Sequence, residues 1–307
     1  MMCCSRQSRF RKNLFLRAKI LDAIRRFFTE SGYLEVETPC RIPAPAPEAH
    51  IDAEPSGNWF LHSSPELSMK RLIAAGFPRL YQICKCFRKN ERGPKHLPEM
   101  TLLEWYTAGM DYVAMMDQCE ELLVAVAESL GLDQILTYQA HSILLARPWD
   151  RITVRRAFEK YTSTPMDVAL HQDRFDEIMA GDIEPNLGTA KPVFLYDYPV
   201  QFGSLAKKNS QNPLVAERFE LYINGIELCN AFTELTDAAE QRQRFDAENH
   251  KRRSLGKHEY PVPEKFLTAL KQMPATAGNA LGIDRLVMLF ADTPRIDDVV
   301  AFTPEEL

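Results

Sequence analysis

The sequence predicts an α+β domain in which helices flank an antiparallel sheet. Two pairs of apolar-rich runs carry this prediction, 80–88 with 100–106 and 216–223 with 226–232. An Asn-Gly dipeptide joins the second pair, and this is the strongest short signal for a hairpin. Successive hairpins with helices around them favour antiparallel pairing. The alternating strand–helix–strand pattern of a parallel sheet is missing, as are the phosphate-binding motifs GxGxxG and GxxxxGK(S/T).

The N-terminal part of the chain begins with a helix. Apolar residues recur at helical spacing over 14–28, and Gly32 stands where a helix end favours glycine. Residues 33–39 alternate briefly and end at a proline, which predicts a strand followed by an extended, proline-rich loop. A second helix is expected over 64–74, because a proline stands in its first turn and a glycine follows its end.

The middle and C-terminal parts alternate between helices and strands. A long helix is expected over 115–130, where leucine and valine recur at helical spacing. Short helices over 153–161 and 173–180 belong to a small helical insert at about 150–190. The remaining expected elements are a strand at 192–198, the hairpin 216–232, a charged helix over 238–254, and a glycine-rich run leading into a helix over 278–290.

Length and composition exclude several classes of protein. Of the 307 residues, 45% are hydrophobic and 26% charged, which describes a folded globular chain rather than a disordered one. We expect an N-terminal tail at 1–13 and a single domain at 14–307. The longest apolar stretches, such as 122–127, are far shorter than the roughly 18 residues of a membrane-spanning helix, so no membrane association is expected. The net charge of −5 predicts no broad basic surface for nucleic acid.

The cysteines predict reduced thiols in a cytoplasmic protein. Their number, seven, is odd, Cys3 and Cys4 are adjacent, and one residue separates Cys84 from Cys86. Neither spacing is that of a tetrahedral zinc site or of a disulfide framework. The N-terminal arginines have no apolar segment behind them, so a secretory signal is not expected.

A charged hairpin loop is the first feature that could take part in binding or catalysis. Phe87-Arg88 ends one predicted strand, and the loop continues to Pro98. Five charged or titratable residues occupy this loop: Lys89, Glu91, Arg92, Lys95 and His96. These groups could hold an anion, and the alternative is an ordinary solvated hairpin tip.

Two further segments combine groups that bind metals and phosphates. Glu227, Asn230 and Glu234 offer oxygen ligands for Mg²⁺. The two carboxylates are an odd number of residues apart, so on a regular strand they would point to opposite faces unless a bend intervenes. In Gly282-Ile283-Asp284-Arg285 the glycine permits close backbone approach and the arginine begins a helix. An arginine on an exposed helical turn is usually only solvated.

Together these segments resemble the catalytic domain of class II aminoacyl-tRNA synthetases. Gly32–Pro39 is similar to motif 1, Phe87–Tyr106 to motif 2 and Gly278–Phe290 to motif 3. Three further segments resemble the lysyl branch of that class: Asp197-Tyr198-Pro199, Ser204-Leu205-Ala206 and Gly225–Asp237. The resemblance covers nearly the whole chain and implies a synthetase-like sheet without an anticodon-binding domain.

The resemblance implies a reaction between ATP and an amino acid that gives an aminoacyl adenylate and pyrophosphate. Such a reaction is catalysed mainly by positioning and electrostatic stabilisation. By resemblance, Arg88 holds the α-phosphate and the substrate carboxylate, and Arg285 holds the γ-phosphate of a bent ATP. Glu227 and Glu234 would ligate Mg²⁺. The other implied nucleotide contacts are His96 at the β/γ end, the backbone of Leu228, and Gly282, which leaves the floor clear of side chains.

A lysine-like substrate carries two ammonium groups, and these need acceptors because an unpaired buried charge is costly. The amino-acid pocket implied by resemblance contains Ser64, Pro65, Glu66, Tyr106, Asn230, Glu234 and Ala280. Glu66 alone has a second interpretation, as an acid favoured by the first turn of a helix.

The adenine contacts depart from the family pattern at three positions. Asn90 stands where the synthetases have glutamate, and Glu91 follows one residue later. Met100 replaces the aromatic residue expected to stack on adenine, and a thioether can pack against a ring face. Leu97 replaces the usual asparagine. None of these changes removes an implied phosphate or metal ligand.

The acceptor of the amino acid is expected to be a protein. Lysyl-tRNA synthetases carry an OB-fold anticodon domain of on the order of a hundred residues before motif 1, whereas only 1–13 precede the first predicted helix here. With a net charge of −5, the chain has no obvious basic surface that would bind tRNA phosphates. It resembles the elongation factor P lysine ligases, truncated lysyl-tRNA synthetase paralogues that transfer β-lysine to a lysine side chain of that factor. Ala280 and Trp105 fit this family.

The expected function is therefore an ATP-dependent ligase that adenylates (R)-β-lysine or lysine and transfers it to elongation factor P. The family implies a homodimer with its interface near 20–39. Two alternatives stay open: a minimal lysyl-tRNA synthetase-like enzyme that acylates an RNA, and a non-catalytic synthetase-like regulator. The clustered charges of Arg88, Glu227, Glu234 and Arg285 argue against the regulator, because a protein without catalysis has no need of them.

Overall fold

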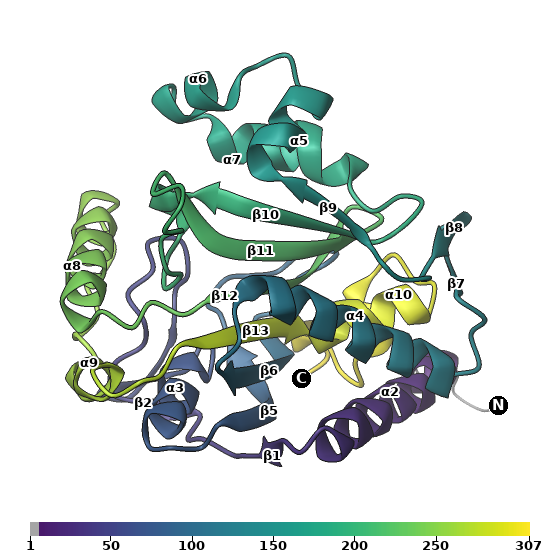
Figure 1. Ribbon diagram of the computed structural model, residues 1–307. Coiled ribbons are helices and arrows are strands. Elements are labelled where there is room, and N and C mark those ends of the chain that lie inside the picture. The colour runs from purple at the N-terminus through teal and green to yellow at the C-terminus, as the bar shows by residue number, and fades with distance from the viewer. Residues whose placement is uncertain (1–5) are drawn as a thin grey trace.

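The computed structural model describes residues 6–307, which form an eight-stranded sheet flanked by helices (Figure 1). The order of strands across the sheet is β1-β5-β6-β13-β12-β11-β10-β9. In that order the strands are Leu34–Glu35, Arg79–Phe87, Glu99–Ala108, Thr276–Gly282, Ile226–Thr233, Val215–Ile223, Val193–Pro199 and Asp150–Thr153. The predicted α+β class is confirmed.

The centre of the sheet is antiparallel, as predicted, but both of its edges are parallel. The strands from β5 across to β10 pair with antiparallel neighbours. At the edges, β1 runs parallel to β5, and β9 runs parallel to β10. Segments that contain helices connect the two strands of each edge pair. Such a crossover lets the second strand run in the same direction as the first. The prediction of an antiparallel sheet therefore holds only for the centre.

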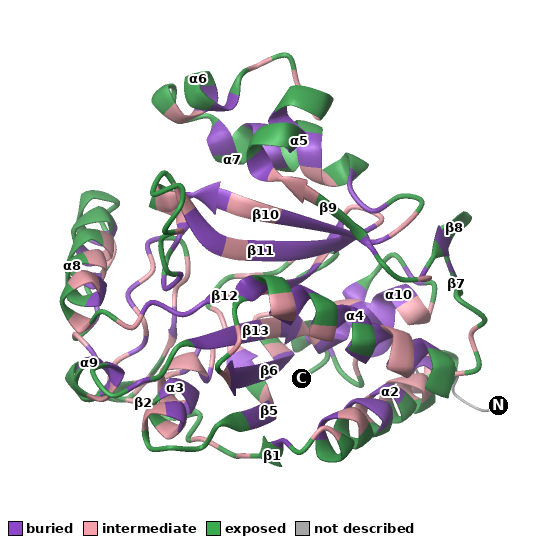
Figure 2. Cartoon of the chain, viewed as in Figure 1, coloured by how far each residue is buried: buried purple, intermediate pink, exposed green. Residues whose placement is uncertain are grey.

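One face of the sheet is buried under three helices: α2 (Arg11–Glu30), α4 (Tyr112–Ser129) and α10 (Ile283–Phe290). Figure 1 shows α4 crossing β12 and β13, with α2 and α10 beside it. The sheet-facing sides of these elements are buried, whereas their outer sides are exposed (Figure 2). The main hydrophobic core therefore lies between this face and the three helices.

Strand β6 shows how the sheet divides its side chains between core and cavity. Leu103 and Trp105 point into the core, where Trp105 packs against Phe28 of α2. Glu104 and Tyr106 line a cavity on the other face. Because successive side chains on a strand point to opposite faces, one strand serves both regions. The polar cavity therefore occupies part of the face away from α2 and α4.

Smaller elements surround the sheet. On the cavity side lie α3 (Glu66–Ala74), α8 (Ala238–Ser254) and α9 (Glu264–Leu270). The insert has its own apolar cluster against β10 and contains α5 (Val154–Tyr161), α6 (Met166–His171) and α7 (Phe175–Ile178). A three-stranded sheet contains β2 (Arg41–Ile42), β3 (Glu54–Ser56) and β4 (Trp59–Leu61), and β7 (Ile135–Tyr138) pairs with β8 (His141–Leu144).

Most predicted elements are present, with differences at their ends. Helix α8 has the predicted bounds, whereas α2 begins inside the predicted tail and a short helix, α1 (Arg6–Arg9), precedes it. Residues 1–5 of that tail lie outside the described residues. The predicted strand 33–39 shrinks to β1, because prolines follow it. The sequence did not predict α6, α9, β9 and the two small sheets, which are too short for an apolar period to show. It also did not predict β13 as a strand, because residues 278–282 read only as a glycine-rich run before a helix. Over 6–307, no helix combines the length and the apolar character needed to cross a bilayer.

Candidate active site

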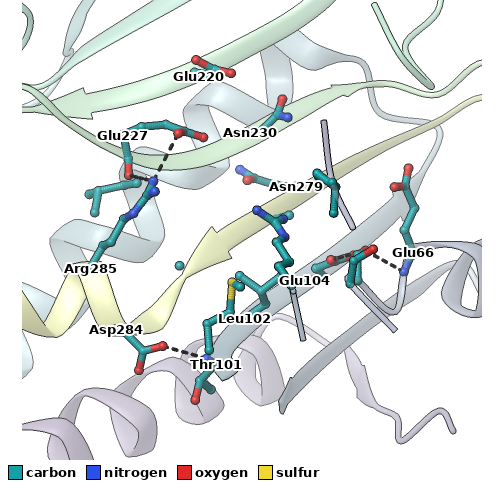
Figure 3. A pocket seen from close by; sticks show the side chains of 18 of the residues that line it. Glu66, Thr101, Leu102, Glu104, Glu220, Glu227, Asn230, Asn279, Asp284 and Arg285 are labelled. Carbon is teal, nitrogen blue, oxygen red and sulfur yellow. Dashed lines mark hydrogen bonds and ion pairs between the residues drawn. The ribbon is translucent and has the colours of Figure 1, made fainter. Parts of the chain in front are cut away.

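The predicted site residues gather in one cavity of about 320 Å³ on the open face of the sheet (Figure 3). The β5–β6 hairpin, β12, β13 and the starts of α3 and α10 border this cavity. Every predicted site residue lines it except Asn90 and Pro65. Asn90 occupies the turn after β5 with a φ of 65°, and Pro65 immediately precedes α3.

A β-bulge brings the two predicted metal-binding carboxylates to the same face of β12. The register between β11 and β12 shifts between Leu221 and Tyr222, and Leu228 is the extra residue on β12. An extra residue reverses the alternation of side chains along a strand. Glu227 therefore lines the same cavity as Glu234, although a regular strand would separate them. The sequence analysis required a bend between the two carboxylates if they were to share a face, and the bulge at Leu228 is that bend.

Arg285, in the first turn of α10, lies at one end of the cavity. Its guanidinium donates to the backbone carbonyl of Glu227 at 2.8 Å and to the Glu227 carboxylate at 3.1 Å. It also donates to the Lys95 carbonyl at 3.3 Å, and its Nη2 lies 2.6 Å from Nε2 of His96. Burial, and then the charge of Arg285, lower the pKa of His96, so the neutral ring accepts this hydrogen bond. We call this group of side chains the phosphate end.

Asp284 anchors the start of α10, and its role was not predicted. Its buried carboxylate accepts a hydrogen bond from the Thr101 amide at 2.7 Å and pairs with Arg17 at 2.5 Å. Arg17 also donates to the Thr101 hydroxyl at 2.7 Å. These contacts connect α2, β6 and α10, so they fix the direction in which Arg285 leaves the helix. No sequence pattern pairs residues so distant along the chain.

Arg88 enters the cavity from the end of β5. Its amide donates to the Pro98 carbonyl at 2.8 Å, which continues the pairing of β5 with β6. Its Nε is buried and has no hydrogen-bond partner among the described residues, and its ion pair with Glu91 is long, at 3.7 Å. A buried donor without a partner is costly. Arg88 therefore has donor capacity available for an anion.

The residues predicted to contact adenine lie beside Arg88. Glu91, Leu97 and Met100 line the cavity, and Leu97 is buried. Leu102, which the sequence analysis did not name, adds apolar surface on the same strand as Met100. This region can accept a flat ring by apolar contact.

At the opposite end of the cavity a buried lysine joins two of the predicted substrate-binding carboxylates. Lys70 of α3 forms ion pairs with both Glu66 and Glu234, and its side chain is 1% exposed. Its Nζ lies 5.0 Å from the centre of the Phe232 ring. Burial alone would lower the pKa of Lys70, but the two carboxylates outweigh it and raise that pKa. The spacing of Glu66 and Lys70 on a helix could have revealed this pair.

Glu104 is a third acid at this end, and it was not predicted. It accepts hydrogen bonds from the Ser64 hydroxyl at 2.6 Å and the Tyr106 hydroxyl at 2.9 Å. Burial, and then the neighbouring Glu66, raise the pKa of Glu104 to about 8. The two-residue period of a strand could have found Glu104, because it precedes Tyr106 by two. We call Glu66, Lys70, Glu104 and Glu234 the amino-acid end.

Two glycines of β13 lie under the two ends of the cavity. A Cβ at Gly278 would collide with Oε1 of Glu234 and with the ring of Tyr106, so only glycine allows these side chains to approach. A Cβ at Gly282 would meet no atom closer than 3.8 Å. The backbone is therefore tightly enclosed under the amino-acid end and has room beside Arg285.

Strand β11 supplies a further wall that the sequence analysis missed. Arg218 donates to Oδ1 of Asn230 at 3.0 Å and to Glu220 at 2.5 Å. The hydroxyls of Tyr198 and Tyr222 both donate to Glu220 at 2.6 Å. Asn230 is thus held in place by a buried network rather than by solvent.

Comparison with known proteins identifies the class to which this fold and site belong. Residues 1–306 match the family model described as tRNA synthetases class II (D, K and N), and the chain belongs to that family.

Curated relatives within this class carry a more particular name. The elongation factor P–(R)-β-lysine ligase of Pectobacterium atrosepticum is 40% identical over 311 residues, which cover 95% of each chain. The ligases of that name from Enterobacter sp. (strain 638) and Salmonella arizonae are 40% and 41% identical over 309 residues, which cover 95% of this chain and 94% of theirs. The predicted membership of this ligase family is confirmed.

Proposed function

We propose that this chain is an ATP-dependent ligase that adenylates (R)-β-lysine, or lysine, and transfers it to a lysine side chain of elongation factor P. The observation that carries the proposal is that Arg88, Arg285, Glu227 and Glu234 line one cavity. The class II family supports the use of ATP. The names of the relatives support the amino acid and the acceptor.

The donors in the cavity fit ATP. Arg88 offers a buried nitrogen that has no partner among the described residues. Arg285 is held by Glu227, whose side chain is 38% exposed, so phosphate oxygens can replace this partner. Arginine suits both positions because its planar fork makes charge-assisted, bidentate contacts with phosphate.

The carboxylates fit Mg²⁺, which prefers oxygen ligands. Burial raises the pKa of Glu220, and the charge of Glu227 raises it further, so these two acids repel each other beside the phosphate end. A bound divalent cation would relieve this repulsion and would screen the phosphates of ATP. Glu234, the other carboxylate that the resemblance implied as a ligand, pairs with Lys70 at the opposite end of the cavity, so Glu227 and Glu234 would not ligate the same ion.

In the first step the carboxylate of the amino acid attacks the α-phosphorus of ATP, a P–O bond forms, and the bond to pyrophosphate breaks. Arg88 neutralises charge that develops on the α-phosphate, and Arg285 with His96 holds the leaving pyrophosphate. In the second step an unprotonated ε-amine of the acceptor attacks the adenylate carbonyl, an amide bond forms, the bond to AMP breaks, and the proton lost by the nitrogen passes to solvent. We assign no general base to this step.

The amino-acid end supports a cationic substrate. Three buried or half-buried acids, Glu66, Glu104 and Glu234, lie around one ammonium group of the described residues, that of Lys70, and Glu104 has a pKa raised to about 8. A substrate with two ammonium groups would supply the charge that favours the ionised form of these acids. Ala280 lines the floor next to this end.

The central experiment is ATP–pyrophosphate exchange with (R)-β-lysine and with lysine, in the wild type and in Glu66→Gln. We expect exchange that depends on one of these amino acids, and we expect Glu66→Gln to raise the KM for the amino acid far more than the KM for ATP. Glu264→Gln is the matched control, because Glu264 also begins a helix directly after a proline but is exposed. If neither amino acid supports exchange in the wild type, the non-catalytic alternative gains ground.

Acylation of an RNA is the second candidate, and the family model, which covers tRNA synthetases, is what favours it. The net charge of −5 opposes it, because phosphate contacts dominate the affinity of proteins for RNA. Offering tRNA and elongation factor P in parallel with labelled amino acid separates the two. Label on the RNA and none on the protein would contradict the proposed acceptor.

We further propose a homodimer in the cytoplasm. β1 lies at the edge of the sheet, and Leu34 in this strand is 48% exposed, which supports an interface near 20–39. Leu34→Glu should shift the sedimentation of the protein from dimer to monomer. The five described cysteines are free, which supports a reducing compartment.

A further inference from the structure

We propose that His62, Cys84 and Cys86 form a Zn²⁺ site behind the wall of the active-site cavity. The ligand atoms of these three side chains lie within 4.8 Å of one another. Over residues 6–307, no other set of three histidine, cysteine or acidic ligand atoms is so close together. His62 and Cys86 are buried, at 1% and 0% exposure, so the cluster is enclosed by the protein.

The distances within the cluster match a tetrahedral zinc site. Sγ of Cys84 lies 3.8 Å from Sγ of Cys86, and Nε2 of His62 lies 4.0 Å and 3.9 Å from these two sulfurs. With Zn–S of about 2.3 Å and Zn–N of about 2.0 Å, tetrahedral geometry separates two sulfurs by about 3.8 Å and a sulfur from a nitrogen by about 3.5 Å. Adjustments of a few tenths of an ångström are therefore sufficient.

The fold explains why the sequence spacing concealed this site. Cys84 and Cys86 are two residues apart on β5, so the pleat points both thiols to the same side. His62 follows β4, and its carbonyl accepts a hydrogen bond from the Phe87 amide at 2.9 Å, which fixes it beside the end of β5. The cysteine spacing alone predicted no zinc ligation, and the third ligand comes from a segment that only the fold brings near.

The cluster also has the chemistry that a metal site needs. Two thiols and an imidazole are the sulfur and nitrogen ligands that zinc takes in structural sites. Nε2 of His62 lies 2.7 Å from the Lys85 carbonyl, so its proton must leave when the metal binds. The His62 amide donates to the Cys40 carbonyl at 2.8 Å, and a water molecule would be the fourth ligand.

The position of the site gives it a structural role. Cys86 precedes Arg88 by two residues, and His62 precedes Ser64 by two. A metal ion bound here would connect the end of β5 to the segment before α3. It would therefore brace the two stretches of chain that carry Arg88 and Ser64 into the cavity, without touching the substrates.

The test is a titration of the reduced, metal-free protein with Co²⁺ as a spectroscopic substitute for Zn²⁺. We expect thiolate-to-cobalt charge-transfer bands and tetrahedral d–d bands that saturate at one equivalent and disappear when Zn²⁺ is added. Cys86→Ser and His62→Gln should lose these bands. Cys119→Ser is the matched control, because Cys119 and Cys229 are also 3.8 Å apart at their sulfurs but belong to no such cluster. This control should bind cobalt as the wild type does.

Several results would overturn the proposal. One is a wild-type protein without tetrahedral cobalt bands, a measurement that does not depend on how any variant folds. Another is a spectrum unchanged in Cys86→Ser, and a third is a mass spectrum with a Cys84–Cys86 disulfide in the protein as purified, with no bound metal. None of these measurements involves ATP or an amino acid. The zinc proposal can therefore fail while the ligase assignment holds, and the reverse is also possible.

Discussion

The two ends of the cavity are both built from charged side chains, yet they are organised in opposite ways (Figure 3). At the phosphate end, the side chains of Arg285 and Glu227 are 20% and 38% exposed and bond to each other. At the amino-acid end, the side chains of Lys70 and Glu234 are 1% and 0% exposed. One end is a solvated cluster, and the other is a buried ionic network.

This difference shows how one cavity can handle two kinds of ligand. A partly exposed ion pair contributes about 0–1 kcal/mol to stability, so phosphates can displace Glu227 from Arg285 at little cost. Breaking a buried pair costs about 3–5 kcal/mol, so the carboxylates beside Lys70 keep their arrangement whether or not a substrate is bound. The phosphate end can therefore adapt, and the amino-acid end is preorganised.

Removing the internal cation should have the largest effect. Lys70→Met leaves Glu66 and Glu234 without their shared partner, so we expect the free energy of unfolding to fall by about 3–5 kcal/mol. Urea unfolding monitored by circular dichroism measures this change. Lys265→Met, at an exposed position of α9, is the control and should unfold as the wild type does. A loss below about 1 kcal/mol would mean that the amino-acid end is as adaptable as the phosphate end.

Arg285→Ala should separate activity from stability. The guanidinium stabilises charge that develops during the reaction, so we expect kcat for pyrophosphate exchange to fall by about 10²–10³-fold. The melting temperature should change little, because the lost ion pair is partly exposed. Arg295→Ala removes another arginine, 65% exposed, that pairs with Asp297 outside the cavity and should leave exchange intact. An active Arg285→Ala would remove this residue from the site.

The sequence predicted the phosphate end better than the amino-acid end, and the reason is physical. Arg88, His96, Glu227 and Arg285 belong to local motifs whose spacing is visible along the chain. One feature of the phosphate end was still hidden. The bulge at Leu228 leaves no signal in the sequence, because the register of β12 depends on the neighbouring strand β11.

Contacts between distant segments were also hidden from the sequence. Asp284 is held by Arg17 from α2, and His62 joins two cysteines of another strand. Glu104 and Lys70 could have been predicted from the sequence, because strand and helix periods place them beside predicted site residues. They were missed because buried charges are rare and a sequence-based core excludes them.

The two glycines of β13 offer an intermediate effect that compares the ends directly. Gly278→Ala forces a methyl group against Glu234 and Tyr106, so we expect a loss of about 1–3 kcal/mol in unfolding free energy. Gly282→Ala meets no atom closer than 3.8 Å and should fold as the wild type does, although its methyl group enters the cavity beside Arg285. Equal stability of the two variants in thermal unfolding would contradict the tight enclosure of the amino-acid end.

The smallest effect concerns the protonation of Glu104. Burial, and then Glu66, raise its pKa in the folded protein to about 8, from 4.5 for an ordinary glutamate. As pH rises between these values, the unfolded chain releases this proton while the folded protein keeps it. The associated stability is complete below pH 4.5 and is lost as pH approaches 8, with a slope of at most about 1.4 kcal/mol per pH unit.

Glu104→Gln should therefore flatten the decline of unfolding free energy between pH 5 and 8, a range set by the raised pKa of Glu104. Other buried acids contribute to the same decline, so the difference between variants is the quantity to measure. Glu99→Gln is the control, because Glu99 lies on the same strand with a 54% exposed side chain, and it should keep the wild-type slope. If Glu104→Gln keeps that slope too, Glu104 is ionised in the folded protein. The amino-acid end would then carry its full negative charge before any substrate arrives, and binding a cationic amino acid would release no proton from it.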